Sequence, residues 1–241
     1  MIHNFDNTIF NFSQLIQEIY KNKYNFEDEL CNLHDILKTF SEKDANELLI
    51  IPTLGVNDRK SVFINDYYNF VDSDPRFLDC YKQFIVTYIK PLFPNETQIL
   101  YQTTPNLRIS FPNCTAIGRT QNDPRTDIIG LHSDCDFGHN AEEVNYIIPI
   151  TNMYDTNSVY YESYEYSNVD YDDYINLKLS PDNFFEGYLN KCRHYNKINE
   201  TGKTRLSLDL RIIPSSKYTD NNKSSITSNK KLTLGEYFSL I

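Results

Sequence analysis

Three side chains that suit a divalent metal stand at two places in the chain. His132-Ser133-Asp134 places an imidazole and a carboxylate two positions apart, and in a strand both side chains point to the same face. A second imidazole, His194, follows a short strand-like stretch. First-row divalent metals accept this ligand set, and three protein ligands leave coordination positions open for other molecules. We therefore predict a metal centre at His132, Asp134 and His194.

An arginine and a serine follow the second histidine, in a run where polar and apolar residues alternate. Arg205 and Ser207 share the polar face of this predicted strand with Asp209 and Arg211. A guanidinium beside a hydroxyl suits the carboxylate of an organic acid, so we assign Arg205 and Ser207 to such a co-substrate. A supporting ion pair is the plainer interpretation of Asp209 and Arg211. If this face lies in water, the run is an ordinary amphipathic strand; if it is buried, its charges must be paired or bound to a ligand.

Composition limits the classes of partner. The chain of 241 residues carries a formal net charge of -10, which disfavours binding to nucleic acid. No apolar run approaches the length of a membrane span, and the first residues lack the pattern of a signal peptide. The five cysteines stand far apart with no C-x-x-C pair, which argues against a disulfide framework and fits a reducing compartment. We therefore expect a cytoplasmic protein; its oligomeric state is not readable from these features.

The first part of the chain, to about residue 97, has mostly helical patterns. Apolar residues recur at helical spacing, and Asp74-Pro75 is a typical helix start. The predicted helices cover residues 12–20, 26–40 and 75–90, and two short strands are predicted at 47–51 and 61–64. We expect this region to support the remainder of a single domain.

From residue 98 the pattern changes to short strands separated by turn residues. The predicted strands cover residues 107–111, 126–132, 144–151, 158–161, 176–179, 183–191 and 204–213. Many short strands with few helices favour a sandwich or barrel. We predict a mainly β core at 98–217 braced by the N-terminal helices, followed by a polar tail at 218–241 that ends in a helix or a strand.

The order of these motifs resembles a known family. His132-x-Asp134, the distal His194 and Arg205-x-Ser207 are similar to the H-x-D…H…R-x-S pattern of Fe(II)/2-oxoglutarate-dependent dioxygenases. The segments 143–151 and 194–211 resemble a bacterial subgroup associated with streptomycin-type biosynthetic clusters. Two details depart from the family pattern, because Tyr195 stands where a glycine often follows the distal histidine and Ser180-Pro-Asp-Asn replaces a Gly-Asp turn. These departures concern loop geometry and leave the ligand set intact.

The resemblance implies a fold, cofactors and residue roles. The fold is a double-stranded β-helix, or jelly roll, and the cofactors are Fe(II), with 2-oxoglutarate and O2 as co-substrates. Asp134 stands where related halogenases have a small residue, so hydroxylation is favoured over chlorination. Asn145 is a further candidate for the co-substrate, and Arg108, Arg119 and Arg211 are candidates for the substrate. An ordinary strand asparagine and ion-paired arginines are the plainer interpretations of these residues.

Two other classes stay open at this point. One is a non-catalytic jelly-roll module that binds a metal without turnover; the other is a cupin-type hydrolase or isomerase. The Arg205-x-Ser207 pair favours the oxygenase over both. The acidic, tyrosine-rich segment 154–174 suggests a small polar or cationic substrate, such as an amino sugar or an amino acid, although a solvated acidic loop explains the same composition.

Overall fold

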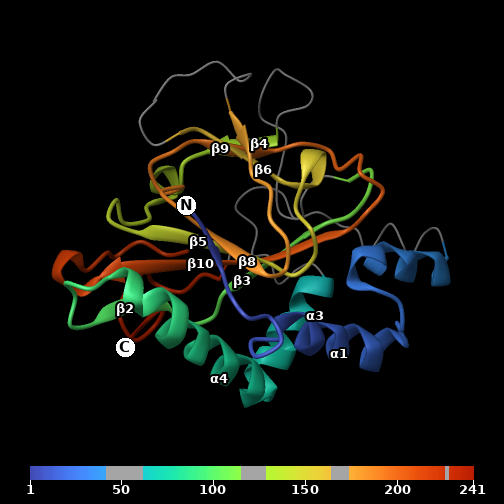
Figure 1. Cartoon of the computed structure of the whole chain (residues 1–241), viewed down its shortest axis with the longest axis horizontal. Coiled ribbons are helices and arrows are strands. Elements are labelled where there is room, and N and C mark those ends of the chain that lie inside the picture. The colour runs from blue at the N-terminus through green and yellow to red at the C-terminus, as the bar shows by residue number, and fades with distance from the viewer. Residues whose placement is uncertain (42–61, 115–128, 164–173, 226–227) are drawn as a thin grey trace.

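Two antiparallel sheets form the centre of the fold, and helices cover the outer face of the larger sheet (Figure 1). The structure is a computed structural model that describes all residues except 42–61, 115–128, 164–173 and 226–227. The larger sheet contains β1 (Ile2–Asn4), β2 (Ile99–Gln102), β3 (Asn106–Ser110), β5 (Val144–Pro149), β8 (Asn183–Gly187), β10 (Arg205–Pro214) and β11 (Phe238–Leu240). The smaller sheet contains β4 (Ile129–His132), β6 (Val159–Tyr161), β7 (Ile175–Asn176) and β9 (His194–Asn196).

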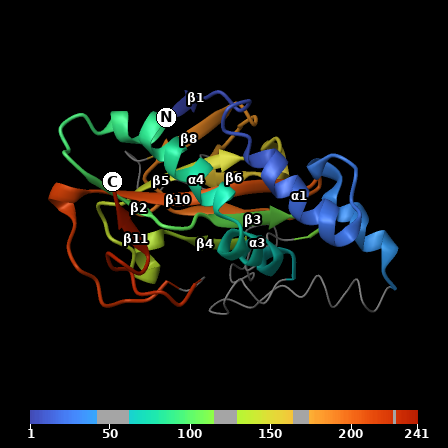
Figure 2. The ribbon, with the colours of Figure 1, turned by 90° about the horizontal axis from the view of Figure 1, so that it is seen from below.

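The strand order brings distant parts of the chain together. In the larger sheet the order is β1-β8-β5-β10-β2-β11, and β3 also pairs with β10; in the smaller sheet it is β4-β9-β6-β7. From β3 to β10 the chain passes back and forth between the two sheets. The long strand β10 lies at the centre of the larger sheet, so each of its faces is covered: one by helices and the other by the smaller sheet (Figures 1 and 2).

The helices α1 (Phe12–Tyr24) and α4 (Pro75–Phe84) each begin directly after a residue whose side chain caps the first turn. Further helices are η1 (Leu30–Thr39) and α3 (Val62–Ser73), and α4 continues through the π-helical turn Ile85–Ile89 and the 3-10 turn Lys90–Leu92. The Asp74 side chain caps α4 by accepting from the Arg76 amide at 2.9 Å, and Pro75 occupies the first helical position, where its missing N–H costs nothing. The predicted helix at 75–90 is confirmed.

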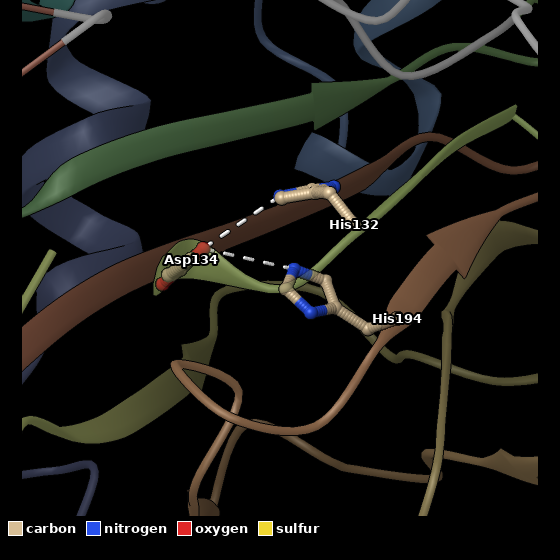
Figure 3. Close-up of side chains that lie close together, drawn as sticks. All are labelled: His132, Asp134 and His194. Atoms are coloured by element: carbon tan, nitrogen blue, oxygen red, sulfur yellow. Dashed lines mark ion pairs between the residues drawn. The ribbon is translucent and has the colours of Figure 1, made fainter. Parts of the chain in front are cut away.

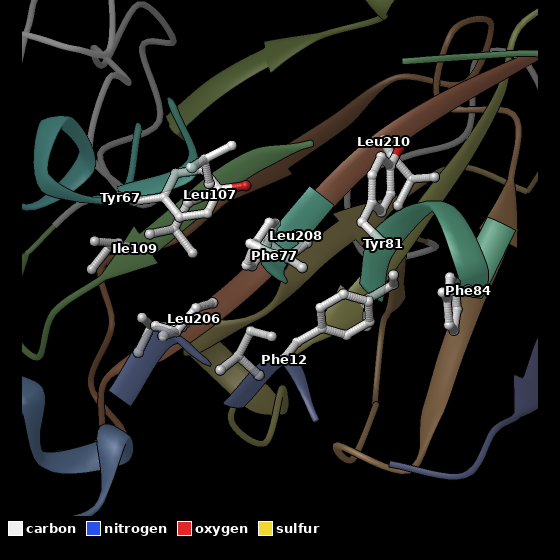
Figure 4. Close-up of a cluster of buried hydrophobic side chains, with 14 of the residues drawn as sticks. Phe12, Tyr67, Phe77, Tyr81, Phe84, Leu107, Ile109, Leu206, Leu208 and Leu210 are labelled. Atoms are coloured by element: carbon white, nitrogen blue, oxygen red, sulfur yellow. The ribbon is translucent and has the colours of Figure 1, made fainter. Parts of the chain in front are cut away.

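The main hydrophobic core lies between these helices and the larger sheet. Figure 4 shows Phe12, Tyr67, Phe77, Tyr81 and Phe84 packed against Leu107, Ile109, Leu206, Leu208 and Leu210. The apolar positions of β10 therefore face the helices, which is the reason for the period-two alternation of this strand. Its polar positions necessarily face the smaller sheet.

Some sequence predictions were wrong in detail. The strand predicted at 61–64 is wrong for its described residues, because Val62 begins α3. The helix predicted at 26–40 is a 3-10 helix, Leu30–Thr39. The strand predicted at 47–51 lies outside the described residues, as do residues 126–128 of the next predicted strand. Predicted strands 176–179 and 183–191 are each longer than the observed β7 and β8.

Both ends of the described chain join the larger sheet. β1 pairs with β8, with Ile2 opposite Phe185. The sequence did not predict this first strand. β11 pairs with β2, with Phe238 opposite Gln102, so the last segment forms a strand. The sequence left a helix or a strand open for this closing segment, and the structure has the strand. In the described part of the chain, no helix is long and apolar enough to cross a membrane.

Candidate metal centre

The three predicted metal ligands lie together at one end of the smaller sheet. His132 of β4 and His194 of β9 are paired across the strands, so their side chains share the face that points toward the larger sheet. Asp134 follows directly after β4, at the start of the 3-10 turn Asp134–Phe137. Its Oδ1 lies 3.6 Å from Nε2 of His132 and 3.9 Å from Nε2 of His194 (Figure 3).

The spacing of these atoms fits one first-row metal ion. All three ligand atoms lie within 4.8 Å of one another, and the three residues are 7%, 5% and 7% exposed. A metal that binds N and O ligands at about 2.1 Å can join two ligands up to about 4.2 Å apart, so both measured pairs are within reach. Two neutral imidazoles and one carboxylate are the ligand set of non-haem Fe(II) sites.

Both imidazoles present the nitrogen that a metal needs. Nδ1 of His132 donates a hydrogen bond to the Gly130 carbonyl, and Nδ1 of His194 donates to the Cys192 carbonyl at 3.2 Å. Because these carbonyls accept the ring protons, Nε2 of each neutral ring carries the lone pair and faces Asp134. Metal-binding histidines usually have such an N–H contact to a backbone carbonyl. These contacts orient the two rings for metal binding.

Asp134 is held from the side opposite the histidines. Its Oδ2 accepts from Arg211 Nη2 at 2.7 Å and from Arg211 Nε at 3.1 Å, and it also accepts from Asn145 Nδ2 at 2.8 Å. Burial alone would raise the pKa of Asp134, but the charge of Arg211, the contact with His132 and the charge of His194 hold it well below its ordinary value. Asp134 is therefore ionised and free to use Oδ1 for a metal.

A buried polar network surrounds Arg211. Its Nε lies 3.4 Å from Glu143, which is fully buried, and its Nη1 donates to Tyr237 Oη at 3.1 Å. Glu143 also accepts from His139 Nδ1 at 3.0 Å, which places His139 beside the metal site as a supporting group. Burial would lower the pKa of Arg211, yet Asp134, Tyr237 and Glu143 keep it well above its ordinary value. The guanidinium is thus a permanent cation between two carboxylates.

The predicted polar face of β10 is buried. Arg205, Ser207 and Arg211 are 2%, 0% and 6% exposed, so this is not an amphipathic strand with a charged face in water. The Arg205 guanidinium donates to Ser207 Oγ at 3.2 Å and to Asn196 Oδ1 at 3.3 Å, and Asn196 lies two positions after His194 on β9. Arg205 and Ser207 therefore lie on the face that meets the metal centre, as their assignment to a co-substrate requires.

Asp209 and Arg211 each bind another partner in place of the ion pair considered for them. Asp209 accepts from Arg108 Nε at 2.9 Å, and Arg211 pairs with Asp134 instead. Side chains two positions apart on one strand point the same way but are separated by about 7 Å along it, whereas Arg108 of β3 lies on the adjoining strand. The plainer interpretation of Arg108 as an ion-paired residue agrees with this contact; a role in substrate binding stays a prediction for Arg108 and for Arg211.

The structure also places the remaining candidates. Asn145 has both ends of its amide engaged, since it donates to Asp134 and accepts from the Asn190 amide at 2.9 Å, so its role toward a co-substrate stays a prediction. Arg119 lies outside the described residues. All five cysteines are free, and burial raises the pKa of the Cys192 thiol to about 11. No cysteine joins the metal-ligand group among the described residues.

Sequence reasoning missed several supporting residues. Glu143, Gln102 and Tyr237 all contact Arg211 or its partners, and none was singled out. A glutamate directly before the apolar strand β5 was a usable signal, because a carboxylate at the start of a buried strand needs a cationic partner. Tyr237 gave no signal, because its position depends on the pairing of β11 with β2.

Comparison with known proteins gives one clear relative by sequence. No protein-family model matches the chain. The streptomycin biosynthesis protein StrG from Streptomyces griseus is 30% identical over 156 residues, which cover 64% of this chain and 67% of StrG.

Comparison with solved structures gives more distant matches. A non-heme monooxygenase, the ThoJ–Ni complex, has a TM-score of 0.44 and 11% identity, and the match covers 97% of this chain and 82% of that protein. SnoK, a non-heme alpha ketoglutarate dependent carbocyclase from nogalamycin biosynthesis, has a TM-score of 0.38 and 12% identity over 59% of this chain and 63% of SnoK. HygX from Streptomyces hygroscopicus, with iron bound, has a TM-score of 0.35 and 8% identity over 77% of this chain and 92% of HygX. Because these scores lie below 0.5, the family assignment rests on sequence.

Antiparallel sheets with a buried two-histidine, one-carboxylate site define a metalloprotein that resembles the non-haem iron oxygenases at its centre. Within that class, the chain belongs to the family of StrG. This confirms the resemblance to the bacterial subgroup that the segments around β5 and β10 indicated.

Proposed function

We propose that this protein is an Fe(II)- and 2-oxoglutarate-dependent oxygenase that hydroxylates a small polar molecule, such as an amino sugar, an amino acid or a related metabolite. The carrying observation is the buried group of His132, Asp134 and His194 with Nε2 of each ring and Oδ1 of the carboxylate converging. Arg205 and Ser207, buried on the facing strand, support the choice of an organic acid as co-substrate.

The fold supports this proposal through its strand order. Four strands of the larger sheet, β3, β10, β5 and β8, face the four strands of the smaller one, and the chain changes sheet at every step from β3 to β10 except between β6 and β7. We interpret these eight strands as a double-stranded β-helix, with β1, β2 and β11 as additions to one sheet. In this arrangement, the interior between the sheets is the place where a metal, a co-substrate and a substrate meet. The helical region 1–97 and the core 98–217 are the units that we propose for the chain.

The proposal assigns a role to each residue of the centre. His132, Asp134 and His194 would hold Fe(II) and leave positions open for 2-oxoglutarate and O2. Bound iron supplies the oxidising chemistry that couples conversion of 2-oxoglutarate to succinate and carbon dioxide with insertion of one oxygen atom into a C–H bond. Arg205 and Ser207 would bind the far carboxylate of 2-oxoglutarate by charge-assisted hydrogen bonds. Arg211 and Asn145 keep Asp134 in place and ionised.

The charge of the chain supports the proposed substrate class. The net charge of -10 and the acidic composition of segment 154–174 favour a polar or cationic molecule over an anionic one. Asp172 and Asp173, the most acidic point of that segment, lie outside the described residues. The relative StrG is named for streptomycin biosynthesis, which favours a small metabolite over a peptide or protein substrate.

An anaerobic titration of Fe(II) and then 2-oxoglutarate into the metal-free protein tests the proposal. We expect a visible charge-transfer band that needs both additions. His132→Ala should abolish the band because a metal ligand is lost. Arg205→Ala should weaken 2-oxoglutarate binding by roughly ten- to hundredfold, the value of hydrogen bonds to a charged group, while Fe(II) alone still binds.

Two matched controls separate these effects from loss of folding. His3→Ala and Arg76→Ala remove the same side-chain types from β1 and from the exposed start of α4, and both should keep the band. Iron binding without a band in the wild-type protein would contradict the oxygenase and leave a metal-binding module or a cupin-type enzyme. Absence of metal binding would contradict the site itself.

A further inference from the structure

Two buried polar atoms on the polar face of the larger sheet have no hydrogen-bond partner. They are Asn106 Nδ2 on β3 and Asp209 Oδ1 on β10. The two residues are paired in register across the strands, so their side chains share one face, with Cβ atoms about 5 Å apart. Asn106 is only 2% exposed. A donor and an acceptor therefore lie side by side in the interior, and leaving both without a partner is costly.

The opposite ends of both side chains are occupied. Asn106 Oδ1 accepts from Tyr68 Oη at 3.2 Å, and Asp209 Oδ2 accepts from Arg108 Nε at 2.9 Å. These contacts orient the two groups so that the amide N–H and the second carboxylate oxygen remain available. Because Arg108 compensates the charge of Asp209, the pair offers hydrogen-bonding capacity more than net charge.

A small cavity adjoins Asn106, and two residues of its wall contact the arginine that holds a metal ligand. The cavity has a volume of about 20 Å³, and its lining includes Asn106, Gln102, Lys230 and Tyr237. A cavity of roughly 10–15 Å³ admits one water-sized group. Gln102 and Tyr237 both accept from Nη1 of Arg211, at 3.4 and 3.1 Å, while the same guanidinium binds Asp134. Arg211 thus links the cavity wall to the metal ligand Asp134.

We propose that Asn106 and Asp209 bind a hydroxyl group of the substrate, and that the substrate is a polyhydroxylated molecule such as a polyol or a sugar. A hydroxyl donates one hydrogen bond and accepts others, so one oxygen atom satisfies Asp209 Oδ1 and Asn106 Nδ2 together. An ammonium group would leave the Asn106 donor without a partner, and a carboxylate would meet Asp209 with like charge. This choice rests on the proposed oxygenase function and narrows its substrate from amino acids to hydroxylated compounds.

Calorimetric titration of the Fe(II)- and 2-oxoglutarate-loaded protein under anaerobic conditions tests the subsite, with myo-inositol, D-glucosamine and L-alanine as probes. We expect the two polyhydroxylated probes to bind and L-alanine to fail. Asn106→Leu keeps the size of the side chain and removes the donor, so it should weaken myo-inositol binding by about tenfold. Asn106→Asp replaces the donor with an acceptor and should shift preference from myo-inositol toward the cationic D-glucosamine, which a purely structural defect would not do.

The controls separate failure of the subsite from failure of the oxygenase. Asn69→Leu and Asn69→Asp make the same changes at an exposed position of α3 and should bind all probes as the wild type does. If the wild-type protein with Fe(II) and 2-oxoglutarate shows no charge-transfer band, the proposed function is overturned before any probe is added. A normal band with no binding of either polyhydroxylated probe, or with binding that ignores Asn106, would overturn the subsite. So would a crystal structure in which one bridging water stays between the two residues under saturating myo-inositol.

Discussion

The two faces of β10 are stabilised in different ways. On the side of the helices, Leu206, Leu208 and Leu210 pack among aromatic rings (Figure 4). On the side of the smaller sheet, each charged group has a particular partner, as Arg211 has in Asp134. Apolar packing depends on volume, whereas a buried ion pair depends on both partners being present. One strand therefore combines a tolerant supporting face with a specific functional face.

Among the variants that test this difference, Arg211→Met should lower the free energy of unfolding most. The change leaves the carboxylates of Asp134 and Glu143 buried without their cation, so we expect a loss of about 3–5 kcal/mol in the free energy of unfolding. Urea denaturation of the metal-free protein measures it. Adding Asp134→Asn to Arg211→Met should recover part of the loss, because one of the two unpaired charges is removed. Equal stability of Arg211→Met and wild type would contradict the role of this network.

Leu208→Ala makes the matching change on the apolar face. Leu208 is fully buried against the helices, and its truncation leaves a cavity that should cost about 3 kcal/mol of unfolding free energy. Fe(II) affinity of the folded protein should stay as in the wild type, because Leu208 points away from the metal centre. Denaturant unfolding and metal titration on the same sample give both quantities. A large drop in metal affinity would show that the two faces are coupled more tightly than we infer.

Asn145→Leu sharpens the comparison, because it should lower the metal affinity more than the free energy of unfolding. The substitution removes one of the donors to Asp134 Oδ2 and leaves Arg211 in place. Loss of such a supporting hydrogen bond should weaken metal binding about ten- to hundredfold, or roughly 1.4–2.7 kcal/mol. Isothermal titration with Ni(II), used as a redox-inert probe, measures the change. Asn152→Leu at an exposed position is the matched control and should leave the affinity unaltered.

The sequence predicted the parts of the site that lie on strong local patterns. His132-x-Asp134 follows an apolar strand, and the alternation around Arg205 and Ser207 is regular, so both their strands and their shared faces were readable. The ligand chemistry and the family resemblance both placed His194 with His132, but no local pattern indicated that β4 pairs with β9. Periodicity identifies a strand and its faces, but the strand that lies beside it is decided by long-range packing.

The parts that sequence reasoning missed depend on contacts between distant segments. The strand β1 was not predicted, and for β11 the sequence left a helix and a strand open; each is only three residues long, and pairing with β8 and β2 stabilises them. A three-residue strand has too few residues for an alternating pattern to be recognised. The partner of Arg211 also comes from a distant segment, because the carboxylate that it binds lies in the turn after β4 and not on β10.

The smallest expected effect tests whether the C-terminal segment belongs to the functional face. Tyr237 lies just before β11, and its hydroxyl oxygen accepts from Arg211 Nη1, which also donates to Gln102. Tyr237→Phe keeps the ring and removes this acceptor, so the unfolding free energy should fall by about 1 kcal/mol. The control is Tyr161→Phe, at a half-buried tyrosine of β6, which should have less effect. If the two variants are equally stable, the hydroxyl of Tyr237 does not support Arg211; if Tyr237→Phe alone loses stability and also binds Ni(II) less tightly, the network extends from the last strand to the metal ligand.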